Sequence, residues 1–320
     1  MNCLSSRSLT NPNCDRYMHA PNPISLAAKA SGEPEFREIG LGPWSETHPG
    51  ETRPDDASSA NYDSRFDTEL LNEGDRRNVL DRYRYWSVSA IKADLDARGR
   101  HDFEVAVENW THDFNIGSIV RTANAFQAKR VHIVGPHKWN RKGALMTELY
   151  QHVEHHPSIA ELVECWRNRI GGEIAYERAR AAAAAIHIHE YGARAAAVGG
   201  QSLIPDSFDG RDTGTANAVS PMQRAMAELA DADSRIKGLQ AARVIALDII
   251  PGAVPMETYR FPRRCLLLFG AEGPGLSQKA LDLADDVVYI SQFGSVRSIN
   301  AGAAAAVAMH AWIAQHAVIA

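Results

Sequence analysis

The sequence has few of the features that mark secreted or membrane-bound proteins. Its cysteines show no C-x-x-C spacing, which argues against a structural zinc site or a disulfide framework and fits a reducing compartment. No apolar run approaches the roughly 20 residues of a membrane helix, and the mean hydropathy is −0.30. The first residues also lack the apolar stretch of a signal peptide. We therefore expect a cytoplasmic protein that makes no contact with a membrane.

A strong excess of either charge is also missing from most of the chain. The net charge is −5, and residues 1–76 hold 13 acidic and 7 basic residues. The remainder is therefore close to neutral, with local basic clusters. The overall charge neither favours nor excludes a nucleic-acid partner.

Residues 1–74 are rich in Pro, Ser, Asn, Asp and Glu and show no sustained hydrophobic period. So little apolar surface does not offset the conformational entropy that ordering costs. We expect a disordered acidic arm here, followed by one domain over 75–320. That domain begins with a helical pattern between Leu80 and Leu95.

Short apolar runs of strand length follow, several of them apolar throughout, as in strands buried on both faces. These runs are Phe103–Val107, Val131–Val134, Val244–Ile250, Cys265–Phe269 and Val287–Ile290. Helical patterns lie between them, at Ile116–Phe126, Ile159–Arg169, Ser277–Leu283 and from Asn300 onward. The alternation predicts an α/β fold with a parallel sheet flanked by helices.

Residues from about 176 to 240 interrupt this alternation. An alanine run, glycines and a polar stretch resemble an insertion into the α/β core. Ser220-Pro221-Met222-Gln223 has the form of a capping box with proline at the first helical position, so a helix is expected from there to about Ile236. Nothing in the sequence assigns this insertion a role.

Three segments that could carry chemistry each follow a predicted strand, where open α/β sheets bind ligands. In the first, Asn115 is a good helix N-cap residue, and Arg121 lies two turns into the helix. In the second, three glycines within six residues surround Glu272 and give a backbone that can lie flat against a ligand. In the third, a polar loop with Ser298 and Asn300 leads into an alanine-rich helix.

Together the three segments resemble the signature motifs of the TrmH-like family in the SPOUT methyltransferase superfamily. Order and spacing both fit over about 170 residues, once the insertion is set aside. The matching residues are Asn115, Gly117, Arg121 and Thr122 in the first motif, Gly270, Glu272, Gly273, Gly275 and Leu276 in the second, and Ile290, Gly294, Ser298 and Asn300 in the third, with Ile299 in place of leucine. The chain departs from the family at Gln127, usually glycine, at Ser291-Gln292 and at Ala301-Gly302.

The resemblance implies a deep C-terminal trefoil knot that holds S-adenosyl-L-methionine, with contacts from Gly270, Ile290 and Ile299. It implies methylation of a ribose 2′-hydroxyl in tRNA or rRNA, and a homodimer in which Arg121 of one subunit completes the site of the other. The family gives the arginine the catalytic role. Because an arginine side chain is a very weak base, we expect Arg121 to clamp a phosphate and position the hydroxyl. Asn115, Glu272, Ser298 and Asn300 would complete the catalytic group.

RNA contacts are expected from two basic segments. One comprises Arg76, Arg77, Arg82 and Arg84 on the first helix, where a solvated helix face is the alternative. The other is Lys138-Trp139-Asn140-Arg141-Lys142, which mixes cations with an indole that can stack on bases. His152, His155 and His156 lack a supporting carboxylate or cysteine pattern, so no metal is expected.

Two rival functions remain open from sequence. One is an RNA-binding protein on a catalytically inactive methyltransferase scaffold, which the retained polar motif residues argue against. The other is a nucleotide-binding enzyme that uses the 270–275 glycines as a phosphate cradle. That segment lacks the lysine of a P-loop, and the sequence lacks a pair of aspartates for Mg²⁺.

Overall fold

The computed structural model describes residues 22–32, 39–111, 115–197 and 220–318. Met1–Gly40 and Leu41–Ala320 form separate units. The described part of the first unit is an exposed helix, α1 (Pro23–Ala30), which the side chain of Asn22 caps. The predicted 1–74 arm therefore lies partly outside the described residues. The polar stretch around 205–219 lies wholly outside them.

The second unit is built around a parallel sheet of seven strands in the order β3-β2-β1-β6-β4-β7-β5. The expected α/β class with a parallel sheet is confirmed. The strands are β1 (Phe103–Glu108), β2 (Val131–Val134), β3 (Val153–His156), β4 (Arg243–Leu247), β5 (Val254–Pro255), β6 (Cys265–Phe269) and β7 (Asp286–Tyr289). Every residue of β1, β2 and β6 is buried, as in a sheet covered on both faces, and this includes the polar residues Glu104, Glu108 and His132.

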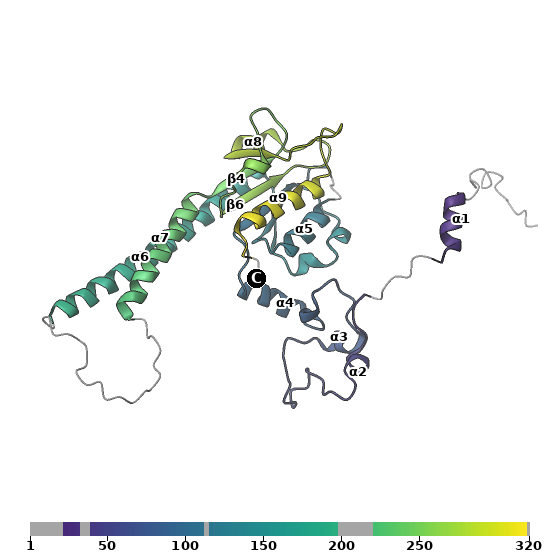
Figure 1. Cartoon of the computed structure of the whole chain (residues 1–320), viewed down its shortest axis with the longest axis horizontal. Coiled ribbons are helices and arrows are strands. Elements are labelled where there is room, and N and C mark those ends of the chain that lie inside the picture. Colours follow the sequence, from purple (N-terminus) through teal and green to yellow (C-terminus); the bar gives the residue numbers. More distant parts are fainter. Residues whose placement is uncertain (1–21, 33–38, 112–114, 198–219, 319–320) are drawn as a thin grey trace, which may run out of the picture. The chain divides into compact units, whose positions relative to one another are not determined.

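Helices cover both faces of the sheet. α5 (Ile116–Ala125) and α9 (Ala301–His316) pack on one face, in a core with Phe103, Leu267 and Trp312. α6 (Ile159–Ala197) and α8 (Gln278–Leu283) pack on the other, around Trp166. Figure 1 shows α9 beside α5, and these helices also contact each other directly. No helix in the described ranges is long and apolar enough to cross a membrane.

The interruption at 176–240 is a helical hairpin. α6 continues from the sheet to Ala197, and α7 (Pro221–Gln240) runs back along it (Figure 1). The predicted capping box at Ser220 and Gln223 is present, with Pro221 in the first turn. Arg180 donates to Glu177 at 2.6 Å and to Asp231 of α7 at 3.3 Å, which ties the two helices together.

Residues 41–74 are folded, contrary to the prediction of a disordered arm. They contain α2 (Trp44–Thr47) and α3 (Thr68–Glu73), and Leu71 is buried. The side chain of Tyr85 donates to the carbonyl of Gly42 at 2.6 Å, and its ring packs against Trp44. The composition of this segment did not predict its order, because its core depends on a few aromatic contacts with residues after position 74, such as Tyr85.

The helix predicted between Leu80 and Leu95 is shorter than expected. A 3-10 turn, η1 (Asp81–Tyr83), precedes α4 (Val88–Ala97), and Tyr85 between them has φ of +60°. A left-handed residue cannot continue a right-handed helix. The apolar period survives because Tyr83, Trp86 and Ile91 still pack together in a small separate core.

Candidate functional site

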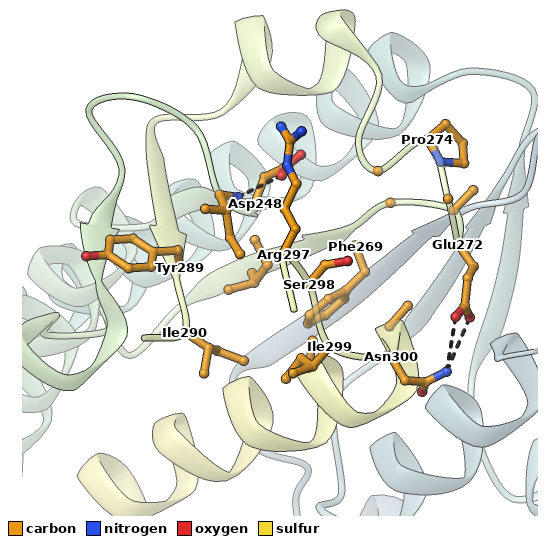
Figure 2. A pocket seen from close by; sticks show the side chains of 18 of the residues that line it. Asp248, Phe269, Glu272, Pro274, Tyr289, Ile290, Arg297, Ser298, Ile299 and Asn300 are labelled. Carbon is orange, nitrogen blue, oxygen red and sulfur yellow. Dashed lines mark hydrogen bonds between the residues drawn. The ribbon is translucent and has the colours of Figure 1, made fainter. Parts of the chain in front are cut away.

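The three motif segments meet at the carboxyl ends of the strands. Asn115 precedes α5, Glu272 follows β6, and Asn300 is the N-cap residue of α9. The side-chain amide of Asn115 donates to the Glu272 carboxylate. The amide of Asn300 donates to Oδ1 of Asn115 at 2.9 Å and to Glu272 at 3.2 Å. The sequence prediction that these three residues share one site agrees with this geometry, and Figure 2 shows the Glu272–Asn300 contact.

Asn300 serves the fold and the site at once. Its Oδ1 accepts the backbone amides of Gly302 at 3.0 Å and Ala303 at 3.2 Å, which caps α9. This leaves its amide group to donate to Asn115 and Glu272. Asn115, in contrast, makes no side-chain cap at α5, although sequence suggested that role. Its side chain binds Glu272 and Asn300 instead, which makes the cluster of Asn115, Glu272 and Asn300 a polar junction of all three motifs.

A cavity of about 730 Å³ lies beside this junction. That volume is within the range of about 300–1,000 Å³ typical of ligand sites. Its lining includes the predicted residues Gly270, Glu272, Ile290, Ser298, Ile299 and Asn300. Glu272 and Asn300 lie together at one end and Tyr289 and Ile290 at the other (Figure 2). The cavity therefore offers apolar side chains, a carboxylate and the exposed backbone of a glycine loop.

The glycine loop is held in shape by close backbone contact. A Cβ atom on Gly270 would collide with the backbone of Gly275 and Leu276. Gly273 and Gly275 have φ of +94° and +73°, a region that favours glycine. The loop turns back on itself through the amide of Gly275, which donates to the carbonyl of Ala271 at 3.0 Å. The loop requires its glycines for these reasons.

Arg121 lies outside the cavity of its own chain. It is exposed on α5 and forms no hydrogen bond or ion pair with any residue that the structure describes. Of the predicted catalytic residues, Arg121 and Asn115 therefore do not line the cavity, although Asn115 reaches it through Glu272. The geometry leaves the guanidinium of Arg121 available to a ligand or to a second chain.

Several residues at the site were missed from sequence. Asp248, after β4, lines the cavity and accepts the amide of Leu276 at 3.4 Å. Glu108, the buried last residue of β1, accepts both the amide and the hydroxyl of Ser277 at 2.7 Å. Polar residues at strand ends are the only sequence signal for either role. Glu108 therefore fastens the end of the glycine loop to the strand that precedes the first motif.

The third motif is anchored through a residue that departs from the family pattern. Ser291 donates its amide at 3.1 Å and its hydroxyl at 2.9 Å to the carboxylate of Glu257. Hydrogen bonds from the backbone amide of Glu257 and from Ser291 lower the pKa of Glu257 below its usual value. Next to it, Oε1 of Gln292 is buried in the cavity wall without a hydrogen-bond partner in the described part of the chain. This atom is an acceptor that a ligand can satisfy.

The basic segment Lys138–Lys142 lies against the first motif. A Cβ atom on Gly117 would come within 2.9 Å of the carbonyl of Asn140 and of Gly143, so the two backbones touch. Lys138, Arg141 and Lys142 are exposed, and the guanidinium of Arg141 lies 5.9 Å from the centre of the Trp139 ring. The structure thus places these cations on the same side as α5, which carries Arg121.

The basic residues before α4 have a different role from the one expected. Arg77 donates to buried Asp75 at 2.7 Å, and Arg84 donates to the carbonyl of Arg77 at 2.8 Å. The side chains of Arg77 and Arg84 are only 10% and 12% exposed. Arg82 lies over the ring of Tyr83. The prediction that these residues lie on the first helix is wrong, since they precede α4, and the side chains of Arg77 and Arg84 stabilise the fold.

Known proteins with similar sequences are methyltransferases. Residues 193–310 match the sequence model of the SpoU rRNA Methylase family. Over this stretch the chain is similar to the SpoU methylases. The match spans the second and third motifs, and the first motif lies before it. The TrmH-like resemblance drawn from the motifs is confirmed.

Curated relatives are similar to part of this chain. A tRNA (guanosine(18)-2′-O)-methyltransferase of Escherichia coli K12 is 32% identical over 82 residues, which are 26% of this chain and 35% of that protein. The Saccharomyces cerevisiae enzyme of the same name is 29% identical over 103 residues, which are 32% of this chain and 7% of that protein. The matched regions thus span about a third or less of the length of these relatives.

Solved structures of two methyltransferase-type proteins can be superposed on part of this chain. The SpoU methyltransferase AviRb from Streptomyces viridochromogenes, in complex with AdoMet, has a TM-score of 0.40 and 22% identity, and the overlap covers 68% of this chain and 58% of that one. The A. aeolicus TrmH/SpoU tRNA modifying enzyme has a TM-score of 0.41 and 13% identity, over 71% of this chain and 81% of that one.

Proposed function

We propose that this protein is an S-adenosyl-L-methionine-dependent RNA methyltransferase that acts on a ribose 2′-hydroxyl. The observation that carries the proposal is the polar junction of Asn115, Glu272 and Asn300 beside the cavity. An inactive scaffold would not need three polar side chains from distant segments to converge on a cavity. The SpoU family match over 193–310 supports the same reaction class.

The residues of the cavity fit the methyl donor. Apolar Ile290 and Ile299 would contact an adenine ring, and the buried Oε1 of Gln292 would accept a hydrogen bond from an amino group. The backbone of Gly270–Gly275 would form hydrogen bonds with the polar groups of the donor. The Asp248 carboxylate would lie near its positively charged centre. When bound, S-adenosyl-L-methionine supplies an electrophilic methyl group on a sulfonium. We expect its surroundings to form the trefoil knot that the family implies.

The chain's own residues would orient the acceptor. Arg121 would clamp an RNA phosphate by charge-assisted hydrogen bonds and thereby position the neighbouring ribose. Arginine is a very weak base, so the hydroxyl proton would leave to a phosphate oxygen or to water. Glu272, Ser298 and Asn300 would orient the ribose, and Asn115 would orient Glu272. Ser298 lines the cavity and is exposed, as such a contact requires.

A homodimer would bring Arg121 to a cavity. Arg121 does not line the cavity of its own chain, and α5 and α9 lie side by side at the surface. The first nine residues of α9 are Ala, Gly, Val and Met, and Ala303 and Val307 are exposed, with Val307 at 45%. Small exposed side chains of this kind allow two helices to approach closely. We therefore propose that Arg121 of one subunit completes the site of its partner.

RNA would approach over α5 and the segment Lys138–Lys142. Exposed cations there would bind phosphates, and the indoles of Trp139 and Trp110 would stack on unpaired bases. The curated relatives methylate guanosine 18 of tRNA. We therefore propose tRNA over rRNA as the first substrate to test, in a cytoplasmic setting.

The test combines donor binding with methyl transfer. The protein is expected to bind S-adenosyl-L-methionine in calorimetry and to methylate a tRNA pool, with the modified ribose mapped by resistance to alkaline hydrolysis. Arg121→Ala should retain donor binding but lose methyl transfer by at least about 100-fold, since it removes a positioning group. Arg178→Ala, an exposed change on α6, is the matched control. Absence of donor binding would favour the inactive RNA-binding scaffold, and near-normal transfer by Arg121→Ala would refute its role.

A further inference from the structure

A second polar cluster lies under α6, on the face of β1, β2 and β3. His132 is fully buried and His156 is 7% exposed. Nδ1 of His132 and Nε2 of His156 face each other at 3.0 Å. The carboxylate of Glu154 lies 3.5 Å from the first of these nitrogens and 3.8 Å from the second. The cluster is remote from the cavity, which is formed by loops after β4, β6 and β7, and the methyl-transfer site does not use it.

Each histidine uses its outer nitrogen on a carboxylate. Nε2 of His132 lies 2.7 Å from Glu104, and Nδ1 of His156 lies 2.6 Å from Glu161. Glu104 is itself paired with Arg264 at 2.7 Å. An ionised carboxylate only accepts hydrogen bonds, so both outer nitrogens carry the proton of their ring. This arrangement of histidine and carboxylate is the typical surrounding of histidines that ligate a metal.

The two inner nitrogens therefore both present lone pairs when the rings are neutral. Two lone pairs at 3.0 Å repel each other in a buried site, and a cation between them removes that conflict. A proton shared between the rings would engage two atoms only. Glu154 also directs a carboxylate oxygen to the same point, so three donor atoms converge there.

The three distances lie within about 0.3 Å of those expected for one face of a tetrahedral zinc site. Zinc binds nitrogen and oxygen ligands at about 2.0–2.2 Å, so adjacent ligands in a tetrahedral site lie about 3.3–3.6 Å apart. The observed edges are 3.0, 3.5 and 3.8 Å. We propose that His132, His156 and Glu154 bind a zinc ion, with water as the fourth ligand. The sequence missed this site because His132 and Glu154 lie on neighbouring strands and become partners only when β2 pairs with β3.

The charges around the cluster are compatible with this occupant. Oε1 of Glu154 accepts from Arg130 at 2.9 Å and from Arg169 at 3.2 Å. Oε2, the oxygen that faces the histidines, accepts from Arg169 at 2.9 Å, and a carboxylate oxygen has a second lone pair for a metal. Glu104 and Glu161 add two negative charges behind the histidines. Glu154 is 36% exposed, which gives an ion a path from solvent.

The test uses metal binding by the full-length protein and does not depend on methylation. After chelator treatment and dialysis, calorimetry with zinc chloride should show one equivalent bound per chain, and cobalt(II) should give the strong visible absorption of a tetrahedral site. Glu161→Gln, which alters the outer hydrogen bond, should weaken zinc binding by about 10- to 100-fold. His156→Gln and Glu154→Gln, which remove ligands, should weaken it further. His155→Gln is the matched control, because His155 is exposed on the same strand.

Zinc should also raise the melting temperature of the wild type and of His155→Gln, but not that of His156→Gln. Circular dichroism identifies any variant that fails to fold. The zinc titration of the wild type tests the proposal even if a variant does not fold. Absence of saturable zinc binding by the wild type would overturn the proposal. Binding that His156→Gln and Glu154→Gln leave unchanged would overturn it equally.

Discussion

The side-chain amide of Asn300 donates to Oδ1 of Asn115 at 2.9 Å, across 185 positions of sequence. The other end of the Asn300 side chain caps α9. Capping and contact with the motif junction therefore depend on one residue. A second variant that removes a helix cap elsewhere can distinguish the contribution of Asn300 to stability from its contribution to the site.

Asn300→Ala should reduce both stability and methyl transfer. Loss of a helix cap costs about 0.5–2 kcal/mol of unfolding free energy, and loss of the amide leaves Asn115 and Glu272 unsupported. Denaturant unfolding and a methylation assay measure the two effects. Ser220→Ala removes the capping box of α7, remote from the cavity, and should lower stability by a similar amount without changing transfer. Equal activity loss in both variants would mean that Asn300 acts through stability alone.

Gly270→Ala should weaken donor binding, whereas Gly294→Ala should not. A Cβ atom on Gly270 collides with backbone, which no rotamer change relieves, while one on Gly294 meets open space. Overpacking of this kind costs about 1–3 kcal/mol, which is about tenfold or more in affinity if the loop distorts. Calorimetric titration with S-adenosyl-L-methionine measures this. Normal binding by Gly270→Ala would show that the loop shape does not control the cavity.

The buried pair of Asp75 and Arg77 should contribute more to stability than the exposed pair of Asp55 and Arg53. Asp75→Asn leaves Arg77 buried without a counter-ion, which costs about 3–5 kcal/mol. Asp55→Asn should cost about 1 kcal/mol or less, because the Arg53 side chain is 38% exposed. Both variants keep the size of the side chain, so denaturant unfolding compares the charges directly. Equal losses of unfolding free energy in the two variants would show that burial does not make the Asp75–Arg77 pair more important.

The same two aspartates predict a loss of stability in acid. A hydrogen bond from Arg53 lowers the pKa of Asp55 to about 2. Burial alone would raise the pKa of Asp75, but hydrogen bonds from Arg77 and from the amide of Tyr85 lower it on balance. Depressed carboxyl pKa values stabilise the fold above the unfolded value near pH 3.9. That stability is lost as the pH falls through the folded pKa values, and unfolding of Asp75→Asn should show a smaller acid dependence than that of the wild type.

Arg141→Ala should weaken RNA binding without unfolding the protein. The guanidinium is exposed and lies over the ring of Trp139, so its loss should lower the slope of log affinity against log salt by about 1. Arg77→Ala should instead lower the melting temperature, since that side chain holds buried Asp75. Binding curves at several salt concentrations separate the two. An unchanged salt slope for Arg141→Ala would exclude this segment from the RNA surface.

Strands were predictable from sequence where both faces are buried. Val131–Val134 and Cys265–Phe269 were identified with their observed bounds, because both are short, mostly apolar runs bounded by polar or turn residues. β3 was missed because it holds the polar residues Glu154, His155 and His156, and Glu154 is paired with Arg130, which lies 24 residues earlier, directly before β2. A strand stabilised by ion pairs carries no hydrophobic signature.

The site was predictable only to the extent that its residues resemble a family. Asn115, Glu272 and Asn300 came from the motifs, and the structure brings them into contact. Glu108 and Asp248 have no motif, and their roles depend on the glycine loop turning back toward β1 and β4. Gln127, which replaces a family glycine, has φ of +51°. The position thus keeps the backbone that favours glycine, and the Gln127 side chain donates to the carbonyl of Leu95.

The pairing of β1 with β6 has a consequence for how the protein is made. The hydrogen bond between Asn115 and Glu272 cannot form until Glu272 leaves the ribosome. Glu272 is synthesised 157 residues after Asn115, and α6 and α7 lie between them. Until then, β1 presents an unpaired apolar edge, which is the kind of surface that aggregates. Contacts so distant in sequence fold slowly, because a long loop must close first. Newly synthesised chains should therefore depend more on chaperones before β6 is complete than after it.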